Sequence, residues 1–584
     1  MACDAITTDR YASEPVPPDD SHEINVDNLL ENLVKPCGLT QWSLALLLMF
    51  STSTLATFPI YGNSASPHRC RMEPEVEQFV DQHNVTFNHF ASRIGPWYGQ
   101  NRSVHPVEFG CLRYKRNWTQ LDLSKLFLSN QSDLEWDAEE PTEPCPKGYV
   151  HQPSDYHYPQ SVVVEFSTVC DYSWLTPFGT SIYMVGMLFG FIVGGWSGDH
   201  FGRRPTIMVA SFVELVTGIW TVLSPNYTNY VLARGFMGVG NTAKISVASV
   251  LNIEMTVARY RSIFHAILAL GLNFLYRSTM ALFAYLIPNW RWMYVATMSP
   301  NFLSVFYFVF LPESPRWLLS RGRRPEALRV LYRACRINHW WRITPEVKQM
   351  RALLTEELEL QKLNKPMMTA SGNVVITPRK RLNLIKPFTS PKMARCTLLC
   401  VCGMLGLVMG FFGLLLYARN LSTYVYLVGF VNALTAIPAN ILSALLYRFC
   451  RRRKRPLMGL ICLAAIILAS SSAYTLIMRP ANDLVMTVSS NLALILVSAS
   501  VCMCYVYVPE LFPSEIRTHA FGLVLGLARV GSIVCTFINE LDRFVAHSVP
   551  MLIYAVVFVC VLVALALLED TSGENLPDVS HENP

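Results

Sequence analysis

Charged residues are scarce in this chain. They make up 15% of its 584 residues, whereas soluble proteins carry about 25%. The deficit comes from long apolar runs such as 42–61 (WSLALLLMFSTSTLATFPIY) and 397–417 (TLLCVCGMLGLVMGFFGLLLY). Each run reaches the roughly 18–20 residues that cross the hydrocarbon core of a bilayer. The composition therefore excludes a soluble globular protein and predicts a polytopic α-helical membrane protein.

Catalytic and metal-binding motifs are also lacking. The chain holds no G-x-S-x-G, H-E-x-x-H or G-x-x-x-x-G-K-[ST] string, which argues against a hydrolase and against an ATP-driven pump. Cysteine triplets occur at 400–402 (CVC) and 502–504 (CMC), but the His and Cys clusters that a zinc site needs do not accompany them. We therefore expect no enzyme activity, no metal, no cofactor and no nucleic-acid partner.

A cleavable secretory signal is missing as well. The first apolar run begins only near residue 42, behind a polar stretch that contains Asp19, Asp20, Glu23 and Asp27 instead of a basic segment. We expect an N-terminal segment over 1–41, followed by a first span that acts as an uncleaved signal anchor.

What the chain does contain is a regular series of apolar segments, and they predict twelve membrane-spanning helices. The predicted spans are 42–61, 178–197, 206–224, 229–252, 263–287, 291–311, 397–417, 423–447, 457–478, 484–508, 519–540 and 549–568. A polar segment over 312–395 separates spans 1–6, of which spans 2–6 occupy 174–311, from spans 7–12 (396–568), and a polar tail follows at 569–584. The predicted architecture is an all-α bundle of two six-helix halves.

The positions of Lys and Arg predict the orientation of the bundle. Basic residues gather in four segments, which are 202–205 (GRRP), 258–261 (ARYR), 312–395 and 448–455 (RFCRRRKR). The alternate short loops are nearly devoid of such residues. Because basic loops stay in the cytosol, we expect both termini to be cytosolic and the large loop over 62–173 to be extracellular.

This large loop carries two signs of an extracellular environment. It holds four acceptor sequences for N-glycosylation, at Asn84, Asn101, Asn117 and Asn130. It also holds an even number of cysteines, which predicts two disulfides with three possible connectivities. The four cysteines are Cys70, Cys111, Cys145 and Cys170.

The inner segment 312–395 is predicted to be helical. Thr344, Pro345 and Glu346 offer an N-cap, a proline at the first helical position and an acid in the first turn. Before them, 323–335 (RRPEALRVLYRAC) predicts a short amphipathic helix.

Five short motifs together resemble one family. They are FSTVCDYSWL (166–175), GGWSGDHFGRRP (194–205), LPESPRWLLSRGR (311–323), PELFPSEIR (509–517) and LLEDTSGENLPD (567–578). In this order and at these places, they resemble the solute carrier 22 family of organic cation, carnitine and organic anion transporters, within the major facilitator superfamily. The resemblance covers residues from about 40 to 578. It implies a plasma-membrane carrier of small organic ions, with a coupling ion or an exchanged anion as a further partner.

The resemblance also implies a set of gating residues. In the family, a loop that corresponds to Asp199, Arg203 and Arg204 looks like a charge latch to neighbouring helix ends, and such pairs can break when the halves rock. The other expected gating residues are Glu254, Arg259, Glu313, Arg316, Glu510 and Arg517. The chain departs from the family pattern at His200, where an arginine is usual, and at 447–450, where an Asp and a Gly are replaced by Tyr and Cys. We therefore expect the latch of the second half to be asymmetric.

An arginine lies in the middle of span 11, in FGLVLGLARVGSIVCTF (521–537). At a helix centre it costs about 2.5–3.5 kcal/mol to insert, so we expect a function for Arg529. Helical periodicity places it on a stripe of small and polar residues, which faces protein or water rather than lipid. The stripe consists of Gly522, Gly526, Arg529, Ser532 and Thr536. The alternative is an internal ion pair, for which the acids near enough by topology are Glu214, Glu540 and Asp542.

Two more basic residues lie inside spans. Lys244 is in span 4, and Arg277 in span 5 lies one turn from Asn273. Glu214 is the one central acid, so it can neutralise Lys244 or Arg277 but not all three cations. A positive interior favours a carboxylate, a sulfate or a zwitterion. The predicted substrate-binding residues are Arg529, Lys244, Arg277, Asn273 and Ser532.

The family resemblance leads to the same expectation. The segment ARVGSI (528–533) is similar to one in which organic anion and carnitine-type carriers have an arginine and cation carriers an aspartate. Cation carriers also tend to have an acid before a proline in span 8, where this chain has Ala436. We therefore expect a carrier of organic anions or zwitterions. The alternatives are an organic cation carrier and a non-transporting surface receptor that exposes its glycosylated loop.

Overall fold

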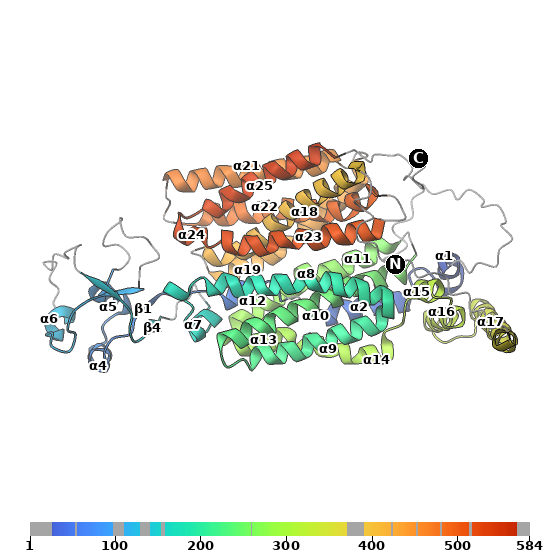
Figure 1. Cartoon of the computed structure of the whole chain (residues 1–584), viewed down its shortest axis with the longest axis horizontal. Helices are drawn as coiled ribbons and strands as arrows, with labels where there is room; N and C mark the ends of the chain where they lie inside the picture. The colour runs from blue at the N-terminus through green and yellow to red at the C-terminus, as the bar shows by residue number, and fades with distance from the viewer. Residues whose placement is uncertain are drawn as a thin grey trace.

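Figure 1 shows the chain as a computed structural model, in which a long bundle of helices has a small domain at one end and a layer of helices at the other. We call the first the loop end, because the domain built from residues 68–151 lies there, and the second the linker end, because the helices between 315 and 370 lie there. The structure describes residues 26–52, 55–96, 110–128, 141–152, 158–257, 260–370, 391–421, 424–450, 454–478, 480, 482–512 and 517–568.

The first half of the bundle contains six spans. They are α2 (Leu39–Ser51) with α3 (Pro59–Gly62), α8 (Leu175–Phe201), α9 (Arg203–Val222), α10 (Tyr227–Glu254), then α11 (Arg261–Leu270) with the π-helical η6 (Gly271–Leu275) and α12 (Tyr276–Leu286), and finally α13 (Trp290–Met298) with the 3-10 helix η7 (Ser299–Phe306) and α14 (Tyr307–Phe310).

The second half repeats this count. Its spans are α18 (Pro391–Tyr417), α19 (Val425–Leu434) with α20 (Ala436–Phe449), α21 (Lys454–Met478), α22 (Leu484–Glu510), α23 (Arg517–Ile538) and α25 (Val549–Ala566), and the short η9 (Ala418–Asn420) and α24 (Leu541–Phe544) lie at the loop end. In Figure 1 the second half, in orange and red, lies above the first half, and α8 and α23 run side by side along the boundary.

Length and apolarity alone do not find all twelve spans. Among the described residues, ten helices are long and apolar enough to cross a membrane. The number is eleven if the bent pair of helices Val26–Val34 and Leu39–Ser51 is counted as one further span. The helix α10 is not among the ten although it has 28 residues. Its polar residues, such as Asn241 and Lys244, are fully buried in the bundle, so they lower its hydropathy without facing lipid. With α10 and the broken first span, the bundle has the predicted twelve spans in two halves.

Small residues allow the helices of the first half to approach closely. A Cβ added to Gly186 of α8 would lie 2.0 Å from the carbonyl oxygen of Gly235 in α10, and one added to Gly238 would lie 2.4 Å from that of Tyr183. Backbones in contact at glycine give membrane helices the close packing that lipid itself does not drive. The second half uses the same device, because a Cβ on Gly531 of α23 would lie 2.4 Å from the carbonyl oxygen of Leu405 in α18.

The loop-end domain is folded around two small antiparallel sheets. β1 (His68–Cys70) pairs with β4 (Tyr149–His151), and β2 (Leu112–Tyr114) pairs with β3 (Thr142–Pro144). Three helices pack on them, and two short helices lead back to the bundle. These are α4 (Pro74–Gln82), α5 (Phe87–Ile94), α6 (Leu123–Leu128), α7 (Val162–Phe166) and the 3-10 helix η4 (Cys170–Tyr172).

Two disulfides close this domain, as the cysteine count predicts. Cys70 is bonded to Cys145, which joins β1 to the segment before β4, and Cys111 is bonded to Cys170, which ties the domain to the start of α8. The structure thereby selects one of the three connectivities. Asn84 and Asn117 lie in this domain, and their glycosylation stays a prediction, while Asn101 and Asn130 fall outside the described residues.

The linker end carries a second helical layer. It comprises α15 (Pro315–Ser320), α16 (Arg324–Asn338), α17 (Pro345–Ala370), α1 (Val26–Leu29) and the π-helical η2 (Leu30–Val34). The helix α17 begins at Pro345, the position that the sequence predicts. Buried apolar side chains join α1 and η2 to α16 and α17, for example Leu30, Leu331 and Met350.

At the loop end, a histidine joins two loops of the second half. His547 precedes α25, and its two ring nitrogens bond to carboxylate oxygens: Nδ1 to Asp542 (3.0 Å) and Nε2 to Asp483 (3.1 Å). Asp542 also accepts a hydrogen bond of 2.6 Å from the Tyr417 hydroxyl at the end of α18. The hydrogen bonds to the two carboxylates raise the pKa of His547 to about 10, so it is an imidazolium at neutral pH.

This bridge predicts a stability that depends on alkaline pH. The folded pKa of His547 lies above its unfolded value of about 6.5, so its contribution is complete below pH 6.5 and is lost as the pH rises toward 10. We expect the thermal midpoint of the wild-type protein to fall between pH 7 and 10, and the His547→Gln variant to lose most of this fall. The control is His83→Gln, because His83 bonds to a backbone carbonyl. Equal slopes for wild type and His547→Gln would contradict the assignment.

Candidate functional site

Arg529 lies on the side of α23 that faces the other helices. Its guanidinium carbon is 4.8 Å from the ring centre of Phe191 in α8 and 5.3 Å from that of Phe412 in α18. The lipid-facing side of α23 carries Leu527, Val530 and Val534 instead, which are 38–42% exposed. Arg529 itself is half-buried. Of the predicted stripe, Gly526, Ser532 and Thr536 are buried and Gly522 is exposed, and its arginine contacts two aromatic rings that belong to different halves.

The acids that could have neutralised Arg529 have other partners. Glu214 pairs with Lys244, and Glu540 pairs with Arg419. Asp542 belongs to the bridge with His547. Among the residues that the structure describes, no carboxylate oxygen lies within 4.0 Å of Arg529. The internal ion pair that the sequence leaves open for Arg529 is therefore absent from this part of the chain.

Arg277 contacts an aromatic ring that adjoins the rings around Arg529. It is 6% exposed on α12, its Nη1 donates a weak hydrogen bond of 3.5 Å to the Asn432 carbonyl in α19, and its guanidinium carbon is 5.8 Å from the ring centre of Phe411. The rings of Phe411 and Phe412 are in turn in edge contact, with 5.2 Å between their centres. No carboxylate of the described chain lies within 4.0 Å of Arg277 either. One phenylalanine pair on α18 thus contacts a guanidinium from each half.

Lys244 is in a different situation. Its ammonium is 2.9 Å from a carboxylate oxygen of Glu214, and both side chains are fully buried. Asn241 donates a 2.7 Å hydrogen bond to the other carboxylate oxygen. This is the pairing alternative that the sequence leaves open, and it neutralises the charge of Lys244. Of the two remaining predicted residues, Asn273 lies in the π-helical turn η6. Ser532 is buried on α23, and its hydroxyl donates to the Arg529 carbonyl (2.6 Å).

Lys244 also closes a break in the first span. The helix α2 ends at Ser51, and the chain is helical again only from Pro59. Inside a membrane the carbonyls freed by such a break need partners from the protein. Lys244 donates to the Ser51 carbonyl, and Tyr276 donates to that of Phe50. The Lys244–Glu214 pair is therefore part of the support of a broken helix.

Arg234 is an interior cation that the sequence reasoning missed. It lies on α10 with 1% exposure, its guanidinium carbon is 4.2 Å from the ring centre of Tyr183, and it donates hydrogen bonds of 3.4 and 3.5 Å to the Leu55 carbonyl in the same break. The signal that could have revealed it is the segment YVLARGFMG (230–238), where one arginine interrupts an apolar stretch within span 4. Arg234, Arg277 and Arg529 together make the interior more positive than the sequence reasoning expects.

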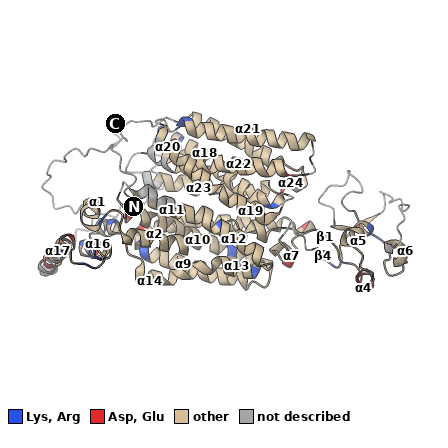
Figure 2. Cartoon of the chain, turned by 180° about the vertical axis from the view of Figure 1, so that it is seen from behind, with Lys and Arg blue, Asp and Glu red and all other residues tan. Residues whose placement is uncertain are grey.

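The predicted gating residues that the structure describes do come together, at the linker end. Arg203 pairs with Glu254 through two hydrogen bonds of 3.0 Å and with Asp199 at 3.0 Å. Glu313 accepts the backbone N–H of Arg203 (2.8 Å) and that of Arg204. Figure 2 shows acidic and basic residues gathered at this end of the bundle.

A short link connects this cluster to the N-terminal segment. Arg316 donates to Asp27 (2.6 Å) and to the Glu254 carbonyl (3.2 Å). Arg259 and the side chains of Glu510 and Arg517 lie outside the described residues. The described cluster is thus confined to the first half and its linker, and its role in gating stays a prediction.

At the loop end, the two halves contact each other. The Ser181 hydroxyl of α8 lies 2.5 Å from that of Thr536 in α23. The ring of Tyr426 in α19 is stacked on Tyr61 (6.5 Å between centres) and is in edge contact with Tyr285 (5.7 Å). These contacts lie between Arg529 and the loop end of the bundle, so they close that side.

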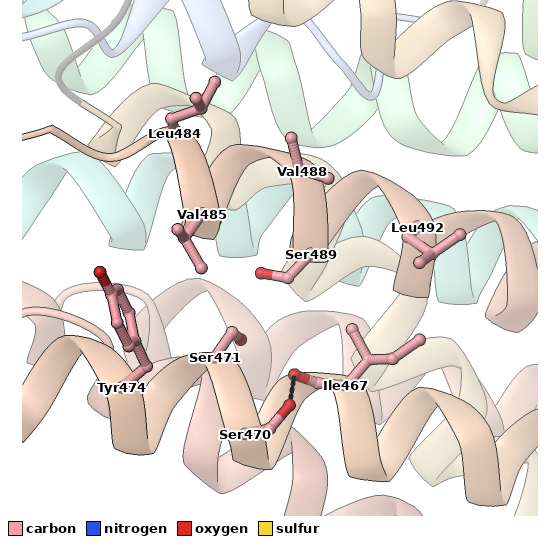
Figure 3. Close-up of a pocket in the computed structure, with 9 residues that line it drawn as sticks. All are labelled: Ile467, Ser470, Ser471, Tyr474, Leu484, Val485, Val488, Ser489 and Leu492. Carbon is pink, nitrogen blue, oxygen red and sulfur yellow. Dashed lines mark hydrogen bonds between the residues drawn. The ribbon is translucent and has the colours of Figure 1, made fainter.

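A groove on the surface of the second half is of a different kind. It has a volume of about 440 Å³ between α21 and α22, and Figure 3 shows its lining, which includes Tyr474, Val485 and Ser489. Its serines use their protons within their own helices, because Ser470 donates to the Ile467 carbonyl and Ser489 to that of Met486. The groove offers no free charged group to an organic ion, so it is not the candidate site.

The paired lysine predicts a specific pattern of stability. Glu214→Leu leaves the Lys244 ammonium buried without its carboxylate, which costs about 3–5 kcal/mol. We expect this variant to lose most of its folded protein at the cell surface. The double variant Glu214→Leu/Lys244→Met removes both charges and should recover much of the loss, as surface biotinylation and the thermal midpoint in detergent can measure. A double variant as unstable as Glu214→Leu would contradict the pairing.

Comparison with known proteins shows that the chain is similar to membrane transporters. Residues 145–569 match the family model described as "Sugar (and other) transporter". The chain is 26% identical over 547 residues to solute carrier family 22 member 6-B of Xenopus laevis, with 92% of this chain and 90% of that protein covered. It is 27% identical over 483 residues to organic cation/carnitine transporter 2 of Homo sapiens, with 82% and 80% covered.

Solved structures with the same fold come from a bacterial sugar carrier. The inward open conformation of the xylose transporter XylE from E. coli has a TM-score of 0.51 at 17% identity and covers 69% of this chain and 88% of that one. Its partially occluded inward open conformation has a TM-score of 0.52 at 16% identity, with 70% and 90% covered. At this identity the likeness shows the fold alone, and it agrees with twelve helices in two halves.

Proposed function

We propose that this chain carries an organic anion or a zwitterion such as carnitine. The chain belongs to the sugar (and other) transporter family and is a solute carrier 22 type of organic-ion transporter. The observation that carries this proposal is the pair of guanidiniums of which Arg277 contacts Phe411 and Arg529 contacts Phe412. In the described chain neither has a carboxylate partner.

The charge of this group selects the sign of the cargo. Two guanidiniums in a partly desolvated interior attract a carboxylate or sulfate and repel a simple cation. The neighbouring helix supports this sign, because Ala436, at the site where cation carriers tend to have an acid, is a buried apolar residue. Arginine also binds carboxylates through two parallel hydrogen bonds, which favours it over a point charge for recognition.

The rings explain why the cargo can be more than a small inorganic anion. The faces of Phe191, Phe411 and Phe412 offer apolar area for an organic body. A ring face that neither guanidinium covers could hold a quaternary ammonium by a cation–π interaction, which would let a zwitterion bind with its two charges on different partners. We therefore propose amphipathic carboxylates and zwitterions as the substrate class.

Alternating access is the proposed mode of transport. The contacts of Ser181 with Thr536 and of Tyr61 with Tyr426 close the loop end, so cargo at Arg529 would exchange with the linker end in this state. The opposite state requires these contacts to part and the halves to rock about the site. We further propose that the protein lies in the plasma membrane with both termini cytosolic, and that a coupling ion or an exchanged anion drives net uptake.

We expect Arg529→Asp to abolish uptake of an anionic substrate while the protein still reaches the cell surface. The substitution replaces attraction by repulsion at the point where the cargo charge would bind. Arg529→Gln, which removes the charge without reversing it, should weaken apparent affinity about tenfold or more, because a hydrogen bond to a charged group contributes roughly 1.5–3 kcal/mol. Radiolabelled uptake normalised to surface biotinylation measures both effects.

The matched control is Arg529→Lys, which keeps the charge and loses the planar guanidinium, and it should retain part of the uptake.

A panel of para-aminohippurate, estrone sulfate, carnitine and tetraethylammonium, each with and without sodium or a preloaded anion, identifies the cargo and its coupling. Unchanged anion uptake by Arg529→Asp would contradict the proposed site. Uptake of tetraethylammonium alone would assign the protein to cation transport, and surface protein without any uptake would favour a receptor.

A further inference from the structure

The turn after α16 exposes an unusual amount of apolar surface for a loop. Trp340, Trp341 and Ile343 are 73%, 59% and 76% exposed. Large exposed apolar residues that adjoin each other mark a contact with a partner or a membrane. This turn is separate from the proposed transport site, because it lies in the helical layer at the linker end.

The backbone of the turn is built to present these side chains. Trp340 and Trp341 both have a positive φ, 53° and 61°, which is an uncommon conformation for bulky residues. The turn is held in place by backbone hydrogen bonds, in which Trp341 N–H donates to the Arg336 carbonyl (2.8 Å) and Arg342 N–H to that of His339 (3.0 Å). A conformation of this cost persists where the surroundings enforce it, and such residues gather at functional sites.

The turn lies at the depth where the membrane-spanning helices end. Asn338, the last residue of α16, accepts a 2.7 Å hydrogen bond from the backbone N–H of Thr40, at the start of α2. Arg333 of the same helix donates to the Val309 carbonyl (3.3 Å), at the end of α14. The helix α16 therefore packs against the linker ends of the first and sixth spans, which is where the lipid headgroups of a surrounding bilayer would lie.

One face of α16 is basic and continues into the exposed tryptophans. Arg329, Arg333 and Arg336 follow one another at steps of four and three residues, so they share one side of the helix, and the turn with the exposed tryptophans follows it. The guanidinium of Arg336 lies 4.4 Å from the ring centre of Trp341. The one acid of α16, Glu326, is already paired with Arg323 (2.6 Å), so it does not neutralise this face.

The neighbouring surface is lipid-facing. Phe308 and Phe310 at the end of α14 are 67% and 62% exposed on the outside of the bundle. A basic face beside the edge of such a surface is the arrangement that binds anionic headgroups, while indoles prefer the interface between acyl chains and water.

We propose that α16 and the turn over 340–343 form an interfacial anchor, which binds anionic phospholipid headgroups of the leaflet at the linker end and inserts the two indoles beside them. The arginines meet the phosphates, and the indoles and Ile343 bury their apolar surface at the top of the acyl chains. The occupant is thus the bilayer itself rather than a soluble protein.

The depth of the indoles can be measured on the full-length protein in nanodiscs that contain brominated phosphatidylcholine. We expect lipids with bromine near the headgroup to quench the part of the tryptophan emission that the variant Trp340→Phe/Trp341→Phe lacks. This variant keeps the aromatic surface of the turn, so it should fold like the wild type. If that part of the emission is not quenched by any brominated lipid, the indoles do not contact the bilayer and the proposal is overturned.

A matched pair of variants tests whether the arginines of α16 bind anionic lipid. In nanodiscs of phosphatidylcholine, addition of phosphatidylserine should raise the thermal midpoint of the wild type by roughly 2–4 °C. Arg329→Gln/Arg336→Gln should lose most of this gain, and Arg329→Lys/Arg336→Lys should keep it. The control Lys348→Gln/Arg351→Gln removes the same charge from exposed positions of α17, which lies beyond α16 in Figure 1, and should keep the gain. Equal gains in the two glutamine variants would overturn the proposed role of the α16 face.

Discussion

The whole arrangement depends on the fact that a membrane interior supplies no hydrogen bonds, so every charge and every freed carbonyl inside the bundle must be met by the protein. In the first half, these hydrogen bonds are concentrated at the break in the first span between α2 and α3. Lys244 and Arg234 of α10, together with Tyr276 of α12, donate to the carbonyls that the first span exposes between Phe50 and Leu55. Glu214 then balances the lysine. Two helices, α10 and α12, are thereby held to the first span by polar contacts, and a third, α9, is held to α10 in the same way.

Against this background, Arg277 and Arg529 stand out because aromatic rings replace a carboxylate as their neighbours. A ring face attracts a cation without neutralising it, so the net positive charge remains for a mobile anion to meet. Both arginines contact the Phe411–Phe412 pair of α18, one from each half. Under the proposed function, a substrate charge placed there would contact both halves and would link binding to their rocking.

The two ends of the bundle have different constructions. At the loop end, disulfides, the imidazolium bridge of His547 and cross-half contacts such as Ser181 with Thr536 make a closed surface. At the linker end, the described ion pairs stay within the first half, as in Arg203 with Glu254, and a helical layer covers them. Among the described side chains, the contacts between the halves that are named above lie at the loop end.

By itself the sequence determined the number of spans, the two-half division, the start of α17 at Pro345 and the presence of two disulfides, because apolar length, turn chemistry and cysteine count are local properties of a chain. It also pointed to Arg529, since a cation in an apolar run is costly wherever the helix packs. Only the tertiary structure decided that Glu214 pairs with Lys244, that Cys70 joins Cys145 and that Arg234 is an interior cation. Those outcomes depend on which helix faces meet, and residues far apart in the chain meet only after the helices have packed.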